Sequence, residues 1–443
     1  MDIAVTMHPP GKILKNATIV IKDGKVIKIS KENTTRVVEG EVIDGKGKIA
    51  LPGFVDAHAH STQSLFRGLL DELPLFPWLT RLRLLMRYTD EKILRAGITV
   101  SLIERIQNGI TTVIDMERCI DTVVNVAKAL GIRLRACYLM FDRHEVPYST
   151  LHTETEVSSE IKMAEKYFKR YDQGSEGLIG IWFAPVGYPA SSPDLLKESA
   201  IRAREIGARL HTHVAEGYAT LLLVKREIGL SEVGLLESIG FLGPDALLAH
   251  CIQIDENDIY LISKYSCSIA HCPSSNMKLG NGIAPVLDML KQRVNVCIGL
   301  DGAASNNSSC ILHEAKIASL VQKGLHREAT TFTALDSLKM ITLNPAKALG
   351  LVGKLGCIKE GALGDVVLIK KRANLFPSRF IVSHIIYAPE VEISDVIIQG
   401  RIIMRDRKLQ TIDEEKALEE AEKEFNRFLD RLPSELYGLC LMS

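Results

Sequence analysis

Two pairs of alternate histidines are the residues of this sequence best suited to chemistry. His58 and His60 are separated by one residue in PGFVDAHAH, and His211 and His213 are separated by one residue in HTHVAE. Residues i and i+2 of a β-strand point to the same side, so each pair can present two imidazoles to one site. Neutral imidazoles are common ligands of divalent metals. Hydrogen-bonded core histidines would have the same spacing, so neither pair alone establishes a metal site.

Three further side chains extend this pattern. Glu216 follows His213 by three residues, where a strand would end, and a carboxyl group there is well placed for general acid/base work. His213 is therefore the candidate ligand of the second pair, and a hydrogen-bonded position one layer deeper is the simpler interpretation of His211. His250 in LLAHC and Asp301 after VNVCIGL also lie at the ends of apolar runs.

Eight short apolar runs, which alternate with amphipathic segments, must position these side chains. The predicted strands are 53–57, 109–116, 132–140, 178–184, 208–214, 245–252, 266–272 and 294–300. The predicted helices include 90–107, 157–171, 192–206, 219–228, 255–264 and 311–322. Eight strand–helix units over about 280 residues predict an α/β fold, a (β/α)8 TIM-like barrel, with a doubly wound sheet as the alternative. Barrel active sites lie at the carboxyl ends of the strands, where the candidate side chains fall.

The two ends of the chain predict a separate small β-sandwich module built from both termini. Asp23-Gly24 joins two alternating runs within 19–29, which is a hairpin signal, and 356–410 contains similar runs. The charged segment 412–431 predicts a terminal surface helix. The predicted divisions are residues 1–51 for the first part of the module, 52–350 for the catalytic barrel, and 351–443 for the rest of the module with the helix.

Composition excludes several other classes of protein. The 54 basic and 54 acidic residues balance, which argues against a protein that coats nucleic acid and against a polybasic membrane-bound protein. The chain shows no secretory signal pattern and no uncharged apolar run near 20 residues. Its nine cysteines include no C-x-x-C pair, which is typical of reduced thiols. These features predict a cytoplasmic protein with no membrane or nucleic-acid partner.

The sequence resembles the amidohydrolase superfamily, in the branch of methylthioadenosine/S-adenosylhomocysteine deaminases and triazine chlorohydrolases and aminohydrolases. The segments that carry the resemblance are PGFVDAHAHSTQSLFRGLLDELPLFPWL, HTHVAE, LLAHC, AHCPSSNMKLGNGIAP, GLDGAASNN and LGCIKEGALGDVVL. They extend along nearly the whole chain. The resemblance implies one divalent metal, usually Zn²⁺ with Fe²⁺ as the alternative, bound by His58, His60, His213 and Asp301.

The resemblance also implies a reaction. Metal-bound hydroxide would attack the carbon that carries an exocyclic amine of an N-heterocycle, such as an aminopurine, nucleoside, pterin or triazine. His250 would contact the metal-bound water, Asp301 would accept its proton, and Glu216 would move a proton to a ring nitrogen. An amine must be protonated to leave whereas chloride need not be, so Glu216 favours deamination over dechlorination.

Four residues are candidates for substrate contact. Trp78 could stack on a flat heterocycle or close the hydrophobic mouth, and Arg87 and Tyr188 could hold ring substituents. His271 could line the mouth or have a structural role at the end of the seventh strand. A small heterocycle is the expected partner. Oligomeric state stays open, with a homo-oligomer as one alternative because relatives are often dimers or tetramers.

Ribose recognition is the feature of this branch that the sequence does not reproduce. The related nucleoside deaminases read the ribose with an acid after the first histidine pair and with a histidine after the fourth strand. Here the corresponding positions offer Met86 and Arg87, and Val186 and Gly187. The sequence therefore predicts an enzyme that does not depend on a ribose.

Other functions remain as alternatives. They are a methylthioadenosine/S-adenosylhomocysteine deaminase proper, a dechlorinating hydrolase, a cyclic-amide hydrolase, and a binding protein that has kept only the fold. Cyclic-amide hydrolases commonly bridge two metals with a lysine carboxylate on the fourth strand, and residues 178–187 contain no lysine. The complete set of candidate catalytic residues argues against a binding protein.

Overall fold

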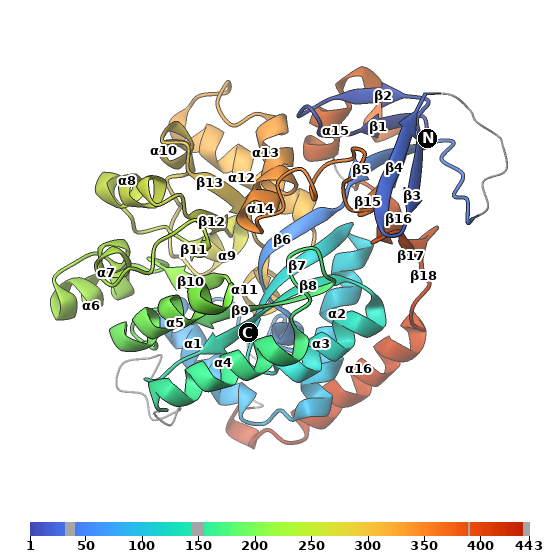
Figure 1. Cartoon of the computed structure of the whole chain (residues 1–443). Helices are drawn as coiled ribbons and strands as arrows, with labels where there is room; N and C mark the ends of the chain where they lie inside the picture. Colours follow the sequence, from blue (N-terminus) through green and yellow to red (C-terminus); the bar gives the residue numbers. More distant parts are fainter. Residues whose placement is uncertain (32–39, 144–154, 389, 437–443) are drawn as a thin grey trace.

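Nine parallel strands, all short and mostly buried, form the central sheet of the computed structural model (Figure 1), which describes residues 1–31, 40–143, 155–388 and 390–436. In chain order they are β6 (Phe54–His60), β7 (Ile110–Glu117), β8 (Arg133–Met140), β9 (Ile179–Pro185), β10 (Leu210–Val214), β11 (Ala246–His250), β12 (Ser268–His271), β13 (Asn295–Ile298) and β14 (Asp301–Gly302). Each strand from β6 to β12 pairs in parallel with the next in the chain.

The last two strands close this sheet into a barrel. β13 pairs with β12, while β14, three residues further along the same segment, pairs with β6 at the opposite edge. The segment 295–302 thus serves as the eighth barrel strand in two parts. Gly299, between them, lies so close to β6 that a Cβ there would be 2.7 Å from the Cβ of His58. The predicted TIM-like barrel is confirmed, and the doubly wound alternative is wrong.

Helices cover the outside of the barrel and begin and end where the sequence supplies caps. Asp90 accepts hydrogen bonds from the amides of Lys92 and Ile93 at the start of α2, and Gly207 ends α5 with a φ of 76°. The helices within the barrel region are α1 (Leu75–Met86), α2 (Glu91–Gln107), α3 (Ile120–Leu130), α4 (Val157–Tyr171), α5 (Pro193–Ile206), α6 (Tyr218–Ile228), α7 (Glu232–Ser238), α8 (Glu256–Lys264), α9 (Pro273–Lys278), α10 (Val286–Lys291), α11 (Ala303–Asn306), α12 (Ile311–His326), α13 (Ala334–Met340) and α14 (Leu343–Ala348). None of the described helices has both the length and the apolar character needed to cross a membrane.

Strands from both chain ends form the second module, as predicted (Figure 1). Its seven-stranded sheet has the order β18-β17-β16-β15-β5-β1-β2, and the predicted hairpin forms a two-stranded sheet of its own. The strands are β1 (Ile3–Val5), β2 (Ile13–Lys15), β3 (Thr18–Lys22), β4 (Lys25–Ser30), β5 (Lys48–Pro52), β15 (Val366–Lys370), β16 (Ile393–Ile398), β17 (Arg401–Arg405) and β18 (Lys408–Leu409), with the helix α15 (Ile381–Tyr387). Only Gly53 separates β5 of the module from β6 of the barrel. The exact divisions 1–51, 52–350 and 351–443 stay predictions.

The C-terminal helix α16 (Glu414–Leu429) packs along α2 of the barrel (Figure 1). Arg427 donates hydrogen bonds of 2.7 and 2.8 Å to the two carboxylate oxygens of Asp90, and Phe428 is fully buried. The predicted terminal helix therefore has one solvent-facing side and one side that covers the barrel.

A buried ion pair joins the barrel to the β module. Arg133, at the start of β8, donates to both oxygens of Asp365, just before β15, over 3.0 and 3.1 Å. Both side chains are buried. Replacing Asp365 by alanine should lower the free energy of unfolding by about 3–5 kcal/mol, because it leaves the guanidinium buried without a counter-charge. Urea denaturation of Asp365→Ala and the parent protein measures this difference.

The matched control is an exposed ion pair. Lys423 and Glu420 on α16 are 3.2 Å apart at the surface, and Glu420→Ala should change the free energy of unfolding by less than about 1 kcal/mol. Equal losses in Asp365→Ala and Glu420→Ala would show that the buried pair does not stabilise the junction.

Candidate active site

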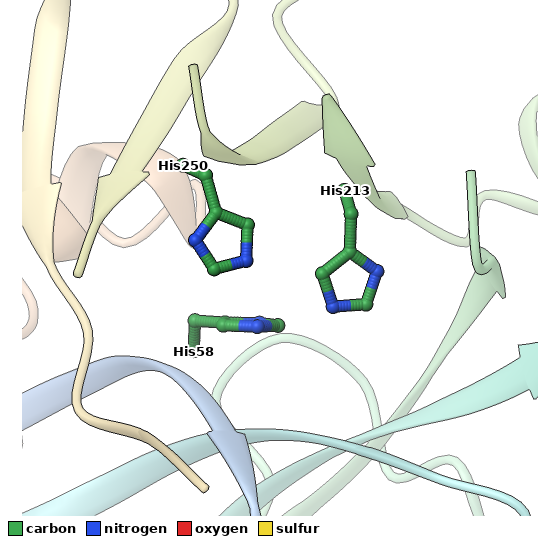
Figure 2. A group of neighbouring side chains, drawn as sticks. All are labelled: His58, His213 and His250. Atoms are coloured by element: carbon green, nitrogen blue, oxygen red, sulfur yellow. The ribbon is translucent and has the colours of Figure 1, made fainter. Parts of the chain in front are cut away.

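Four strand ends bring histidines and one aspartate into a single cluster. The Nε2 atoms of His60 and His213 are 3.3 Å apart, and the Oδ1 atom of Asp301 is 3.7 and 3.8 Å from the Nε2 atoms of His58 and His60. His250 joins His58 and His213 in a second group whose ligand atoms all lie within 4.8 Å of one another. Figure 2 shows the rings of His58, His213 and His250 turned toward one shared space.

Hydrogen bonds to backbone carbonyls fix which nitrogen of each ring bears the proton. His60 Nδ1 lies 2.7 Å from the Met116 oxygen, and His213 Nδ1 lies 2.6 Å from the Val186 oxygen. A carbonyl oxygen can only accept, so Nδ1 is protonated in both rings and Nε2 presents a lone pair. The two Nε2 lone pairs therefore face each other across 3.3 Å.

For His58, a relay of hydrogen bonds through the ring of His211 fixes which nitrogen bears the proton. His211 Nδ1 donates to the Leu247 carbonyl over 2.8 Å, so its Nε2 accepts from His58 Nδ1, also over 2.8 Å. His58 Nε2 then carries a lone pair, is fully buried, and has no hydrogen-bond partner among the described residues. His211 is buried and hydrogen-bonded, as predicted, and it orients a neighbour rather than pointing into the cluster.

The histidines of the cluster are held in the neutral form. Burial lowers the pKa of His60 to about 4 and that of His211 to about 3, and it also lowers the pKa of His213 and His250. Burial alone would raise the pKa of Asp301, but attraction to any positive charge that His60 takes up and a hydrogen bond from the Ser275 hydroxyl hold this pKa below its usual value. Three bare imidazole nitrogens and a carboxylate oxygen thus converge without a proton between them.

This donor set fits a divalent cation. Metal–ligand bonds of about 2.0–2.2 Å place neighbouring ligand atoms roughly 3–4 Å apart, which matches the spacings of the cluster. The buried Nε2 of His58, which has no hydrogen-bond partner among the described residues, also needs a hydrogen-bond donor or a metal ion at its lone pair, since an unpaired buried polar atom is costly. The remaining oxygen of Asp301 accepts from the hydroxyls of Ser275 and Ser305 over 2.6 and 3.2 Å, as expected for an oriented carboxylate ligand.

Glu216 lies next to this cluster. Its Oε2 atom is 3.8 Å from His250 Nε2, and its Oε1 atom accepts from the Asn281 amide over 3.3 Å. His250 Nδ1 donates to the Asn276 oxygen over 2.8 Å. His250 and Asp301 have φ values of 70° and 62°, an unusual left-handed backbone that often accompanies functional sites.

One cavity contains the mouth-facing members of this cluster together with two of the predicted substrate contacts. His60, His213, Glu216, His250 and Asp301 all line it. The predicted contacts Trp78 and Tyr188 line it as well; the Tyr188 hydroxyl donates to Glu227, and Trp78 is buried.

The other two predicted contacts, Arg87 and His271, are not among the described residues that line this cavity. Arg87 is exposed just beyond the end of α1, whereas Arg83 and Met86, one helical turn apart, face the cavity. His271 is buried at the end of β12, and its Nδ1 has no hydrogen-bond partner among the described residues.

Sequence reasoning missed Glu117 and Arg83. Glu117 is the last residue of β7 and lines the cavity. The signal that could have found it is the one that found His250, a chemistry-bearing residue at the carboxyl end of a barrel strand. Arg83 carried no such signal, since only the rotation of α1 decides which of its arginines faces the cavity.

His211 offers a test of the relay that leaves the metal-facing side chains intact. His211→Ala should weaken binding of Zn²⁺ by about 10–100-fold, because His58 loses the acceptor that fixes its ring. Competition with a chromophoric chelator measures this affinity without any activity assay. The control His326→Ala, on the exposed end of α12, should bind Zn²⁺ like the parent protein. Equal affinities in all three proteins would refute the relay.

Comparison with known proteins identifies the family of this chain. The family model described as "Amidohydrolase family" matches residues 49–403. The chain belongs to the amidohydrolase family. The predicted superfamily is therefore confirmed, and so is the predicted enzyme class, a hydrolase of carbon–nitrogen bonds other than peptide bonds.

Three similar proteins give the context for this amidohydrolase. The 5'-deoxyadenosine deaminase of Methanosarcina mazei is 33% identical over 434 residues, which cover 97% of this chain and 98% of the relative. The 5-methylthioadenosine/S-adenosylhomocysteine deaminase of Thermococcus onnurineus is 36% identical over 401 residues, 89% of this chain and 91% of the relative. The structure of an adenosine deaminase from Xanthomonas campestris with bound zinc has a TM-score of 0.89 at 24% identity, covering 96% and 97% of the two chains. That structural similarity supports the fold.

Proposed function

We propose that this amidohydrolase removes the ring-bound amino group of an adenosine-type nucleoside. The observation that carries the proposal is the convergence of three Nε2 lone pairs and the Asp301 carboxylate beside Glu216 in one cavity. The substrate class is supported by relatives named as deaminases of 5'-deoxyadenosine and of methylthioadenosine and S-adenosylhomocysteine, which match most of this chain.

One divalent metal per chain, Zn²⁺ with Fe²⁺ as the alternative, belongs to this proposal. His58, His60, His213 and Asp301 would hold it. When bound, such an ion activates water as a nucleophile at neutral pH. β9 contains no lysine. Cyclic-amide hydrolases commonly bridge two metals with a lysine carboxylate on this strand, so its absence here favours a single ion.

The chain's own residues would handle the protons of the reaction. Glu216, steadied by Asn281, protonates a ring nitrogen next to the carbon that carries the amine, which makes that carbon electrophilic. Asp301 accepts a proton from the attacking water, and His250 orients that water through its Nε2 lone pair. The proton held by Asp301 then passes to the amine, and the carbon–nitrogen bond breaks with release of ammonia. The hydroxyl on the product carbon loses its proton to Glu216, which restores the acid and leaves a ring carbonyl.

The nucleoside proposal replaces the expectation that no ribose is read. The two expected positions indeed carry no acid and no histidine: Met86 faces the cavity, and Gly187 lies where a Cβ would be 2.6 Å from the His213 carbonyl oxygen. These observations favour a ribose-free heterocycle as the second candidate substrate. A nucleoside substrate therefore requires a ribose partner elsewhere in the cavity.

An ammonia-release screen of the zinc-loaded enzyme separates the two substrate classes. Adenosine, 5'-deoxyadenosine, methylthioadenosine and S-adenosylhomocysteine are compared with adenine, guanine, a pterin and aminotriazines. We expect a nucleoside to exceed the free bases by more than about 10²-fold in kcat/KM, or about 2.7 kcal/mol of transition-state preference. A free heterocycle that wins by that margin would overturn the nucleoside proposal.

Cytoplasmic location, the absence of nucleic-acid and membrane partners, and a homo-oligomeric state stay predictions.

A further inference from the structure

A second buried carboxyl group, that of Glu232, lies beside Glu216 in the wall of the active-site cavity. Glu232 is the first residue of α7, is buried, and lines the cavity together with Ala215 and Glu216. Its Oε2 atom accepts a hydrogen bond of 2.6 Å from the Ala215 amide. None of the proton transfers of the proposed mechanism involves Glu232, so this contact needs another explanation.

The Ala215 amide lies just beyond the point where β10 has a neighbouring strand on both sides. Two residues earlier, the His213 amide donates to the Val186 carbonyl over 3.2 Å, on the side of β9. Amides of residues i and i+2 in a strand point to the same edge, and β9 ends at Pro185. The Glu232 carboxyl takes the place of a strand carbonyl for Ala215, whose buried amide would otherwise be left without an acceptor at a cost in free energy.

The backbone at Ala215 makes the turn that leads from β10 to Glu216. Ala215 has a φ of 50°, in the left-handed region that a residue with a Cβ keeps only where surrounding contacts hold it. Its amide is held by Glu232, and its carbonyl accepts from the amides of Ile252 and Gln253 over 3.0 and 2.8 Å. The turn is thus fixed on one side by α7 and on the other by the segment after β11.

The position of this turn matters for the chemistry of the next residue. Glu216 must lie within hydrogen-bond reach of the ring nitrogen to deliver a proton. A displacement of about 1 Å in a reacting group can lower a rate about 10²-fold. The Ala215 turn fixes the backbone from which the Glu216 side chain extends toward His250 and Asn281. A contact that holds the turn therefore also sets the direction of the catalytic carboxyl.

Charge determines the form in which Glu232 makes this contact. Burial raises the pKa of Glu232 to about 8, the hydrogen bond from the Ala215 amide acts against burial, and the nearby Glu216 and Asp258 act with it. Glu232 is therefore mostly a neutral acid at neutral pH, and its carbonyl oxygen still accepts from the amide. A glutamine has the same acceptor without a charge, whereas a leucine of similar size has none.

We propose that Glu232 is a positioning residue for Glu216, because it holds the Ala215 turn that directs the catalytic carboxyl toward the substrate ring. This inference rests on the proposed deaminase function but not on which ring is the substrate. Glu232 acts through Glu216 and contributes no ligand to the metal.

The test measures kcat and KM of the zinc-loaded enzyme for the best substrate of the ammonia-release screen. Glu232→Leu removes the acceptor and should lower kcat by about tenfold or more, while KM stays within about threefold of the parent value. Glu232→Gln keeps the acceptor and should restore kcat to within about threefold of the parent value. Glu198→Leu, at an exposed acid of α5 that does not line the cavity, is the matched control and should leave both constants unchanged.

A second measurement separates positioning from support of the whole fold. In a Glu216→Gln background, Glu232→Leu should lower kcat by less than about threefold, because the carboxyl that it positions is no longer there. If Glu232→Leu does not fold, Glu232→Asp takes its place in both backgrounds, since the shorter side chain withdraws the acceptor from the Ala215 amide. Zinc content and thermal unfolding check that each variant is folded.

The outcomes distinguish the role of Glu232 from the proposed function. A parental kcat in Glu232→Leu, an equal loss in both backgrounds, an equal loss in Glu232→Gln, or a change confined to KM would refute this role while the deaminase function stands. If the parent enzyme releases no ammonia from any ring of the screen, the deaminase function fails and this inference fails with it.

Discussion

His213→Ala should lose its bound metal and its deaminase activity together. The substitution removes one of three imidazoles whose Nε2 atoms converge with Asp301, and His60→Ala should act in the same way. We expect kcat/KM to fall by more than about 100-fold, since even residues that only orient a metal ligand contribute 10–100-fold. Metal analysis of the purified variants, together with ammonia release, measures both effects.

The parent protein sets the reference for this experiment. It should carry about one divalent ion per chain, and the control His326→Ala should match it in metal content and turnover. Full metal occupancy in both His60→Ala and His213→Ala would exclude these residues as ligands. Two ions per chain would instead favour the cyclic-amide hydrolase alternative.

Glu216→Gln should keep the metal and lower kcat by at least about 10²-fold. The carboxyl group lies 3.8 Å from His250 and is hydrogen-bonded to Asn281, and an amide in the same place cannot deliver a proton to the ring nitrogen. Steady-state ammonia release with saturating substrate measures kcat, and metal analysis measures occupancy.

Glu198→Gln is the matched control, because it makes the same change at an exposed acid of α5 that does not line the cavity. It should retain kcat within about threefold, the ordinary effect of a surface substitution being small. Near-parental turnover in Glu216→Gln would mean that another group supplies the proton.

The barrel and most of the catalytic cluster were predictable because they depend on local rules. Strands buried on both faces have short, nearly continuous apolar runs, and parallel strands place their carboxyl ends at one end of the barrel. His58, His60, His213, His250 and Asp301 each follow or end such a run, so their convergence followed once the barrel was inferred. The helix predicted at 157–171 has the same bounds in the structure, since its amphipathic pattern is strong.

The substrate wall was less predictable because it depends on how elements face one another. Arg87 was the predicted contact of α1, but the helix rotates Arg83 and Met86 toward the cavity and leaves Arg87 in solvent. A shift of one residue turns a helical side chain by about 100°, and only packing against the barrel decides the rotation. Glu117 was hidden for a related reason, since its partner Thr62 is 55 residues away in the chain.

The sequence by itself determined the residue types of the cluster, the strands that carry them and the family they resemble, because strand periodicity and strand ends are local properties of the chain. Only the tertiary structure decided which ring nitrogens are free to bind a metal, that His211 orients His58, and that Glu117 and Arg83 face the substrate cavity. Proton positions depend on carbonyls such as those of Val186, directly after β9, and Leu247 in β11, and both β9 and β11 pair with the strand that carries the two histidines. Hydrogen bonds between strands form only when the barrel closes, so no stretch of sequence specifies them alone.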